Sequence, residues 1–404
     1  MTAIVGVLNK HAVAIAADSA VTLGGGKKVM NVANKLFALS KHHPVAISIY
    51  GNAEFIGTPW ETIIKEYRKK LGDKSFPHLK GYVDNFIKFL KDKNYYCTDK
   101  EADEDTAASI FLLFKNICDV AFRDSNRFGK ILDNLDRQNL PHLLGGFAQE
   151  TVVYFNRIVD TILPDILKYL KDEGITIEEE RLKSFTESVF THNICHTRQS
   201  GLVFSGYGEK DLFPAIYNCA IGGVINKKLA KMVKKEAEIS KKEGSAIRPF
   251  AQTDVMKTIL EGVAPKIQDI YLSSMEKTFL KFTEILANLL EPKDKALSVA
   301  VKNLKIDAFK IMFLKMSKTA QKEKYTDPFE DSVASLEKED LADFAESLIR
   351  LTSLKRRISM EQDTVGGPID VMVISKGDGV IWMKRKHYFD PSLNHQFFDN
   401  YFNT

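Results

Sequence analysis

Two apolar runs at the start of the chain, joined by a polar turn, limit the possible folds more than any other feature. The runs cover residues 2–7 (Thr-Ala-Ile-Val-Gly-Val) and 12–17 (Ala-Val-Ala-Ile-Ala-Ala), and the turn is Asn9-Lys10-His11. Short apolar runs with branched residues predict buried strands, and the short turn predicts that they pair as a hairpin. Asp18 follows the second run, so we expect its carboxylate at a strand end, close to the first strand.

Thr2 directly follows Met1 and gains a chemical function if Met1 is removed. Its free α-amine, with a reference pKa of roughly 7.7–8.0, would then serve as the base for its own hydroxyl. Lys35 lies inside a third predicted strand, residues 29–39, where a buried ammonium needs an acidic partner, and Asp18 is the obvious one. A cation near Thr2 would help to keep the α-amine neutral, because two nearby positive charges repel.

Four segments resemble the start of proteasome β-type subunits and their bacterial peptidase relatives, which are N-terminal-nucleophile hydrolases. They are residues 2–7, 16–19 with Thr22, 34–37 and 46–53. The resemblance covers about the first 70 residues in order, with one length difference in the glycine turn at 24–26. It implies an α+β fold of the N-terminal-nucleophile type, an αββα four-layer sandwich in which two sheets lie between layers of helices.

The resemblance also implies roles for individual residues. The matching catalytic positions are Thr2, Asp18, Lys35 and Gly51. The threonine would be the nucleophile, the aspartate a buried acid and the lysine the group that tunes the nucleophile, while the glycine N–H would stabilise the oxyanion. The matching substrate-binding positions are Val21, Thr22, Ala33, Ile49 and Ala53. Thr22 would hydrogen-bond the substrate backbone as an added strand, and the other four would line an apolar specificity pocket.

The C-terminal part of the chain matches the same pattern less well. A predicted helix at 341–359 precedes residues 362–367, where the family has Asp-x-x-Ser-Gly-Gly and this chain has Gln-Asp-Thr-Val-Gly-Gly. Asp363 and Thr364 are therefore expected to act as helper residues from a shifted register. Two further candidates, without a motif behind them, are Gln252 and Thr253, which stand where the family contacts the nucleophile's amine.

The middle of the chain is longer than the resemblance explains. We expect one domain, residues 1–404, with helical insertions at 75–198 and 275–335. The lysine-rich stretch 227–242 is interleaved with glutamates, which predicts a solvated helix, and residues 322–339 read as a charged linker. The later predicted strands lie at 201–208, 212–219 and 366–383.

Composition predicts a cytoplasmic protein without a membrane span or a cofactor. The 404 residues are 44% hydrophobic, enough for a core, and no run has the length of a membrane span or the form of a signal peptide. The four cysteines show no close pairing, which favours reduced thiols. The net charge of +4 is modest and residues 24–27 lack the spacing of a phosphate-binding loop, so no nucleic-acid partner is expected. His192 and His196 flank Cys195 at a spacing that suits a metal, but a polar helix end is the favoured interpretation and no metal is expected.

The sequence thus predicts a threonine peptidase or related amide hydrolase acting on polypeptides. The resemblance implies a homo-oligomer, as a ring or another closed assembly, and an ATP-dependent unfoldase as a potential partner. Two alternatives stay open. One is a catalytically inactive structural or scaffold subunit, and the other is a small-molecule amidase that uses the same nucleophile in a pocket shaped by the helical insertions.

Overall fold

The described residues form two five-stranded antiparallel sheets, two two-stranded ribbons and a larger number of helices. The structure is a computed structural model that describes residues 2–23, 28–30, 33–92, 97–136, 149–190, 199–304, 307–359, 365–387, 389–396 and 399. Each main sheet has five strands, and helices and strands are not arranged in the regular alternation of a parallel α/β fold. The predicted α+β class is therefore confirmed.

The first sheet has the predicted N-terminal hairpin at its centre. In spatial order its strands are β12 (Ser245–Ala251), β1 (Ala3–Asn9), β2 (Ala12–Ala17), β13 (Asp370–Ser375) and β14 (Gly379–Lys384). Asn9 holds the hairpin turn, because its Oδ1 accepts hydrogen bonds from the backbone N–H groups of His11 at 2.9 Å and Ala12 at 3.2 Å. Since β13 pairs with all of β2, residues from both ends of the chain meet in one sheet.

The second sheet is built from the middle of the chain. Its strands are β11 (Lys228–Glu238), β10 (Ala215–Ile225), β9 (Ser200–Gly206), β6 (Val45–Gly51) and β5 (Leu36–Ala38). The predicted strand at 29–39 is interrupted, because β4 (Lys28–Met30) pairs with β3 (Val21–Leu23) in a separate ribbon while only β5 joins the sheet. A second small ribbon consists of β7 (Glu54–Phe55) and β8 (Thr58–Pro59).

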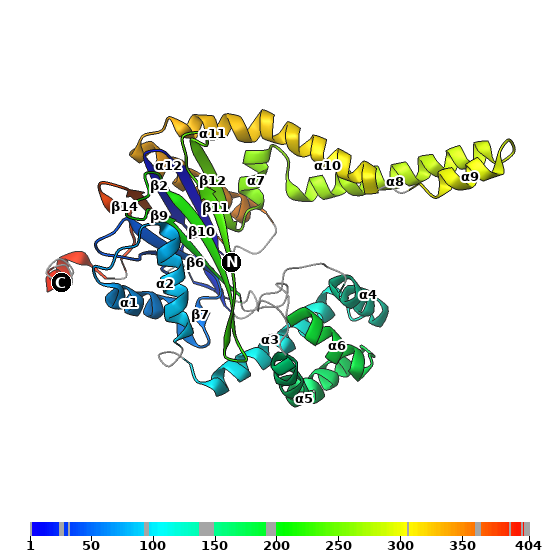
Figure 1. Ribbon diagram of the computed structural model, residues 1–404, viewed down its shortest axis with the longest axis horizontal. Coiled ribbons are helices and arrows are strands. Elements are labelled where there is room, and N and C mark those ends of the chain that lie inside the picture. Colours follow the sequence, from blue (N-terminus) through cyan, green and yellow to red (C-terminus); the bar gives the residue numbers. More distant parts are fainter. Residues whose placement is uncertain are drawn as a thin grey trace.

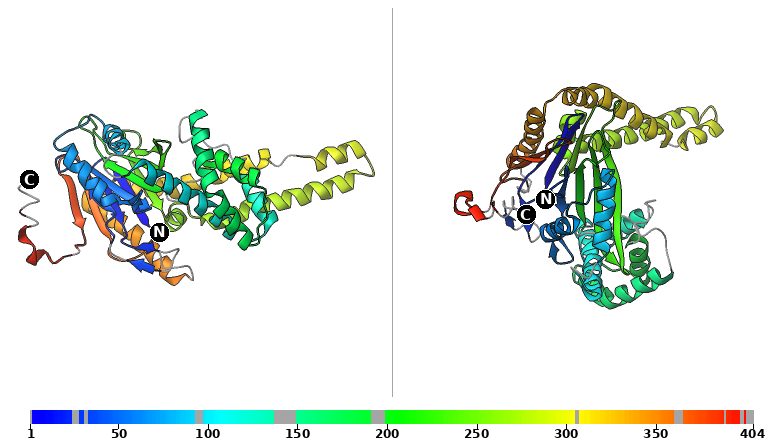
Figure 2. Two further views of the ribbon diagram at one scale, coloured as in Figure 1. Left: turned by 90° about the horizontal axis from the view of Figure 1, so that it is seen from below. Right: turned by 60° about the vertical axis from the view of Figure 1, so that its left-hand side comes forward.

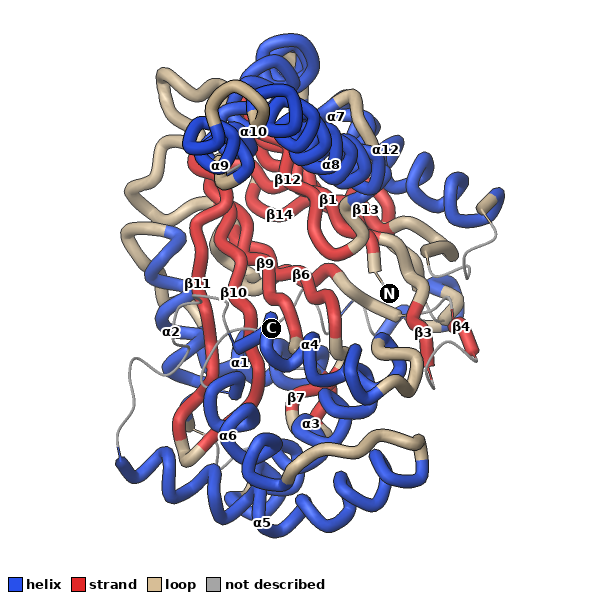
Figure 3. Tube along the Cα trace, turned by 90° about the vertical axis from the view of Figure 1, so that its right-hand side faces the viewer, coloured by secondary structure: helices blue, strands red, loops and turns tan. Residues whose placement is uncertain are grey.

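The two sheets face each other, and helices cover their outer faces (Figure 3). Strand β1 shows why: Ile4 and Leu8 pack toward Val203 in the second sheet, while Val5 and Val7 pack under helices on the other side. Those helices are α7 (Asp254–Glu261), α11 (Asp327–Ala334) and α12 (Lys338–Ile358). Helices α1 (Trp60–Leu71) and α2 (Leu79–Lys91) cover the second sheet. The specific assignment to the N-terminal-nucleophile type of sandwich stays a prediction.

Two helical segments extend from this body (Figure 1, Figure 2). One contains α3 (Asp99–Val120), α4 (Ser125–Asp136), α5 (Gln149–Asp172) and α6 (Glu179–Phe190), which share a core of their own around Phe114, Phe155 and Phe185. The other is an arm of α8 (Pro265–Leu290), α9 (Lys295–Lys302) and α10 (Asp307–Gln321), which leaves large apolar side chains such as Phe282 and Met316 exposed. A short 3₁₀ helix, Pro391–Leu393, lies near the C-terminus. The predicted domain and insertion boundaries stay predictions.

Two local predictions are wrong. The lysine-rich stretch 227–242 is not a helix, because most of it forms β11, whose pairing with β10 buries Leu229 and Ala230 while the lysines line the outer strand of the sheet. The expected linker at 322–339 is also helical: a π-helical turn at Lys322–Thr326 leads into α11, and Val333 packs under the first sheet.

Within the described residues, none of the helices combines the length and the apolar character required to cross a membrane.

Candidate active site around Thr2

Thr2 lies at the entry to β1, between the ends of β12 and β2, and is 7% exposed. Its backbone carbonyl accepts a 3.0 Å hydrogen bond from the N–H of Gln252, which follows β12. Ala251, paired with Ala3, has a φ of +63°, a backbone conformation that costs free energy for a residue with a side chain. Strand β1 is therefore held between β12 and β2. Gln252, one of the two candidates that had no motif in the sequence, is hydrogen-bonded to Thr2. The other, Thr253, precedes α7 and makes no side-chain cap hydrogen bond.

Asp18 occupies the position predicted for it, directly after β2, and is 1% exposed. Its Oδ1 accepts a hydrogen bond from the Ala3 N–H at 2.9 Å and one from Lys35 Nζ at 2.7 Å. Its Oδ2 accepts from the N–H groups of Ala20 and Gly366, each at 3.2 Å. Four donors thus converge on one buried carboxylate, and one of them belongs to the residue next to Thr2.

Lys35 is 3% exposed and is bound on two sides. Besides the Asp18 carboxylate, its ammonium contacts the carbonyl of Ala20 at 2.6 Å. Burial lowers the pKa of Lys35, the ion pair with Asp18 opposes that shift, and the nearby cation of Lys386 adds to it. The structure therefore places a buried, tethered cation beside the start of β1, as the sequence predicted.

A second buried ion pair, missed in the sequence analysis, lies beside the first. Asp370, 3% exposed, is opposite Ala17 in the pairing of β13 with β2, and its carboxylate accepts hydrogen bonds from the Nζ and, at 2.8 Å, the backbone N–H of Lys386. Lys386 lowers the pKa of Lys35 and Asp370 raises it. No short-range pattern in the sequence connects Lys386 with Asp370.

Gly51 ends β6 with a φ of +81°, and a Cβ at this position would come within 2.4 Å of the Gln199 carbonyl oxygen. Only glycine fits such a conformation without strain. The same strand is joined to the charged pair, because the Ile49 N–H donates a 2.9 Å hydrogen bond to the Lys35 carbonyl. The structure thus connects Gly51, Lys35 and Asp18 through neighbouring strands, and the oxyanion role of Gly51 stays a prediction.

The predicted substrate-binding residues are spread over several environments. Val21 in β3 and Ala33 are half-buried near Asp18, and the Ala33 N–H donates to the Ser19 carbonyl at 3.1 Å. Ala53 is exposed, whereas Ile49 is 7% exposed and packs in the core under α1 and α2. For Thr22 the structure describes only the backbone, which pairs with Val29.

The C-terminal helpers, Asp363 and Thr364, lie outside the described residues, but the segment that follows them reaches the site. The Gly366 N–H donates to Asp18, and the Ser19 Oγ donates a 2.5 Å hydrogen bond to the Pro368 carbonyl. The chain after the predicted helpers is thereby tied to the same acid as Ala3 and Lys35.

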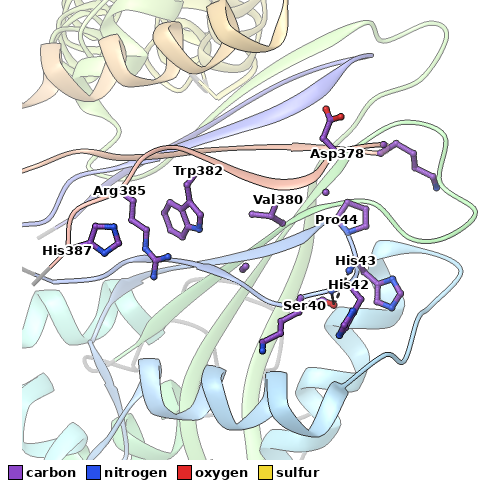
Figure 4. A pocket seen from close by; sticks show the side chains of 14 residues that line it. Ser40, His42, His43, Pro44, Asp378, Val380, Trp382, Arg385 and His387 are labelled. Atoms are coloured by element: carbon purple, nitrogen blue, oxygen red, sulfur yellow. Dashed lines mark hydrogen bonds between the residues drawn. The ribbon is translucent and has the colours of Figure 1, made fainter. Parts of the chain in front are cut away.

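A cavity of about 660 Å³ lies elsewhere, between the β5–β6 turn and β14 (Figure 4). Its polar lining is largely engaged within the protein: Lys376 donates to three backbone carbonyls, Asp378 pairs with Lys338, and Arg385 lies 4.7 Å from the ring centre of Trp382. No sequence-predicted site residue lines it.

Among the described residues no group of three or more His, Cys, Asp or Glu side chains is arranged to hold a metal ion. His192, Cys195 and His196 fall outside the described part of the chain.

Comparison with known proteins gives matches to solved structures alone. No protein-family model matches the chain, and no curated protein matches it. The helical assembly of the Anbu complex from Pseudomonas aeruginosa is 10% identical, with 99% of this chain and 94% of that chain covered and a TM-score of 0.31. Anbu from Hyphomicrobium sp. strain MC1 is 8% identical, with 99% and 95% covered and a TM-score of 0.29.

These comparisons correct the family assignment made from the first 70 residues. The assignment to proteasome β-type subunits and their bacterial peptidase relatives is wrong as stated, because no family model or curated protein supports it. The alignments to Anbu chains have TM-scores and identities too low to replace it.

Proposed function

We propose that the protein is a threonine-type amide hydrolase that cleaves polypeptides once Met1 is removed and Thr2 becomes the first residue. The observation that carries the proposal is the buried pair of Asp18 and Lys35, whose carboxylate also binds the N–H of Ala3. A buried pair costs desolvation free energy, and apolar residues of similar volume often serve stability equally well. Its position beside a threonine at a strand end supports a chemical role.

The reaction needs few groups beyond Thr2 itself. The Thr2 Oγ attacks the amide carbonyl carbon while the α-amine, directly or through a water molecule, takes the hydroxyl proton. The C–N bond then breaks, the proton passes to the leaving amine, and an ester to Thr2 remains. Water hydrolyses this ester and restores the hydroxyl. The backbone N–H of Gly51 is assigned to the oxyanion in both steps.

The charges around Thr2 suit this chemistry. An α-amine serves as a base only when it is neutral, and the cation of Lys35 disfavours a second positive charge nearby. Asp18 fixes that cation through its Oδ1 at 2.7 Å and fixes the first strand through Ala3. Lys35 is thus proposed to tune the nucleophile and Asp18 to position both.

The proposal extends to the less direct predictions. Asp363 and Thr364 are proposed as helpers, because the following Gly366 binds Asp18. Val21, Thr22, Ala33, Ile49 and Ala53 are proposed to contact the substrate. The two stacked sheets with helices on both outer faces are compatible with an αββα enzyme of this type. A closed homo-oligomer, with an unfoldase as partner, remains part of the same hypothesis.

Intact mass and one variant test the proposal. We expect purified protein to lack Met1 and to hydrolyse members of a panel of peptides and small amides. Thr2→Ala should lose all turnover and all acyl-enzyme signal in mass spectra, while Thr2→Ser, which keeps a hydroxyl and the α-amine, should retain activity. Retention of Met1, or full activity of Thr2→Ala, would overturn the catalytic assignment. Absence of turnover with Met1 removed would favour the scaffold alternative, and turnover of small amides alone would favour an amidase.

A further inference from the structure

The ion pair of Asp370 and Lys386 is a buried charged group that the proposed mechanism does not use. Asp370 is 3% exposed, and the Lys386 side chain is 11% exposed. The carboxylate accepts hydrogen bonds from the Lys386 ammonium and from the Lys386 backbone N–H, so the two residues are fixed to each other twice. Desolvation of such a pair makes it weak evidence for stability alone.

Strand register places this pair at the same end of the sheet as Thr2. Asp370 is opposite Ala17 on β2, and Ala17 is in turn opposite Ile4 on β1. Asp18 follows Ala17 directly and binds the N–H of Ala3. After the larger effects of burial and of Asp18, Lys386 lowers the pKa of Lys35 and Asp370 raises it.

This end of the sheet therefore contains two buried ion pairs, Asp18 with Lys35 and Asp370 with Lys386. Other charged groups lie on the elements packed around them. Glu61 on α1 contacts Asn34, the neighbour of Lys35, at 3.3 Å, and Asp254 at the start of α7 pairs with Arg356 on α12 at 2.6 Å. Glu61 and Asp254 thus each have a polar or cationic partner of their own. Asp370 and Lys386 form the other buried acid–lysine pair beside Asp18 and Lys35.

We propose that Asp370 and Lys386 form a second positioning pair of the candidate site, which balances the charge around Lys35 and so sets the pH at which the Thr2 α-amine becomes a base. This inference rests on the proposed function of Thr2 and deepens it. Neither residue is assigned a contact with substrate. Each acts through the field at Lys35 and Thr2.

Single substitutions of the pair should then shift the amine in opposite directions. Lys386→Met leaves a buried carboxylate without its cation, which favours a protonated α-amine and moves the acid limb of kcat/KM to higher pH. Asp370→Asn leaves a cation without its acid and moves the acid limb to lower pH. Each shift should be on the order of 0.5–1 pH unit, and the double variant should return close to the wild-type profile.

A neighbouring acid–lysine pair provides the control. Glu346 on α12 is 4% exposed and binds Lys384 of β14, two residues before Lys386. Neither Glu346 nor Lys384 is among the groups that shift the pKa of Lys35. Glu346→Gln and Lys384→Met should leave the acid limb where it is, even if they lower the free energy of unfolding.

The experiment measures the acid limb of kcat/KM and, independently of turnover, the pH dependence of acetylation of the Thr2 α-amine by mass spectrometry. Opposite shifts in the two single variants, with recovery in the double variant, support the proposal. Shifts of the acid limb in the same direction, or no shift, would overturn the proposal. A pair with a purely structural role would lower the free energy of unfolding but would not shift the acid limb in opposite directions in the two variants. Retained Met1 instead removes the α-amine from Thr2 and defeats the proposed function itself, so the two failures are distinguishable.

Discussion

The ammonium of Lys35 lies 2.7 Å from the carboxylate of Asp18, and both side chains are almost completely buried. The pair is asymmetric. Asp18 also accepts hydrogen bonds from the backbone N–H groups of Ala3, Ala20 and Gly366, whereas within the described part of the chain Lys35 has one other acceptor, the Ala20 carbonyl. The Asp18 carboxylate therefore connects β1, β2 and the C-terminal segment. The charge of Lys35, in turn, is balanced by the Asp18 carboxylate.

This asymmetry predicts unequal losses of stability. Asp18→Ala leaves Lys35 without its acid and three N–H groups without their acceptor, and should lower the free energy of unfolding by about 3–5 kcal/mol. Lys35→Met should cost clearly less, because the three N–H donors still stabilise the carboxylate. Urea denaturation followed by circular dichroism measures both. An equal or larger loss in Lys35→Met would show that the backbone donors do not hold the acid.

The charge of Lys35 should be visible in the pH dependence of catalysis. Lys35→Met removes a cation near the Thr2 α-amine, so the amine should protonate more readily and the acid limb of kcat/KM should move to higher pH. A shift on the order of one pH unit is expected when a nearby buried charge is removed. Lys65→Met is a suitable control, because that lysine is exposed and pairs with Glu61 on the surface of α1. An unchanged acid limb in Lys35→Met would refute the tuning role.

The residues near the start of the chain were the part of the site most accessible to sequence analysis. Continuous apolar runs on both sides of a short turn specify a buried hairpin, and Asp18 at its end was the obvious partner for a buried Lys35. Both features are local in the sequence, which explains why β1, β2 and the Asp18–Lys35 contact agree with the prediction.

The remaining parts depend on contacts between distant segments. The pair of Asp370 and Lys386 is created by the register of β13 against β2 and by the chain after β14, neither of which is encoded in a short pattern. The stretch 227–242 has a composition typical of a solvated helix, but most of it forms strand β11 because it pairs with β10. The family resemblance rested on the same local residues, and no family model or curated protein supports it.

Gly51 permits a test of backbone geometry in the proposed oxyanion site. Gly51→Ala forces a Cβ to within 2.4 Å of the Gln199 carbonyl oxygen at a φ of +81°, so the end of β6 must move. Displacement of an oxyanion donor typically lowers kcat on the order of 10²-fold or more. Gly57→Ala is the matched control, because Gly57 has a similar φ of +77° but open space around it. Comparable activity in both variants would remove Gly51 from the mechanism.

Asp211 supplies a prediction for stability as a function of pH. It lies in the loop after β9, and its Oδ2 accepts hydrogen bonds from the backbone N–H groups of Leu79, at 2.9 Å, and Gly208, at 2.7 Å. The first of these satisfies an N–H at the start of α2, while Oδ1 contacts the ring of His78 at 2.6 Å. Burial alone would raise the pKa of Asp211, but the hydrogen bonds from these three residues together hold it below its usual value.

A carboxylate whose pKa is lower in the folded state contributes stability above its unfolded pKa, about 3.9, and loses that contribution as the pH falls through the folded value. Asp211→Asn should therefore lower the free energy of unfolding by about 1 kcal/mol at pH 7 and by progressively less below pH 4. Urea titrations of wild type and variant between pH 3 and pH 7 measure the difference. Exposed Asp92, at the opposite end of α2, gives the control substitution to Asn. A loss of free energy of unfolding that is the same at every pH would show that the ionised form of Asp211 does not stabilise the start of α2.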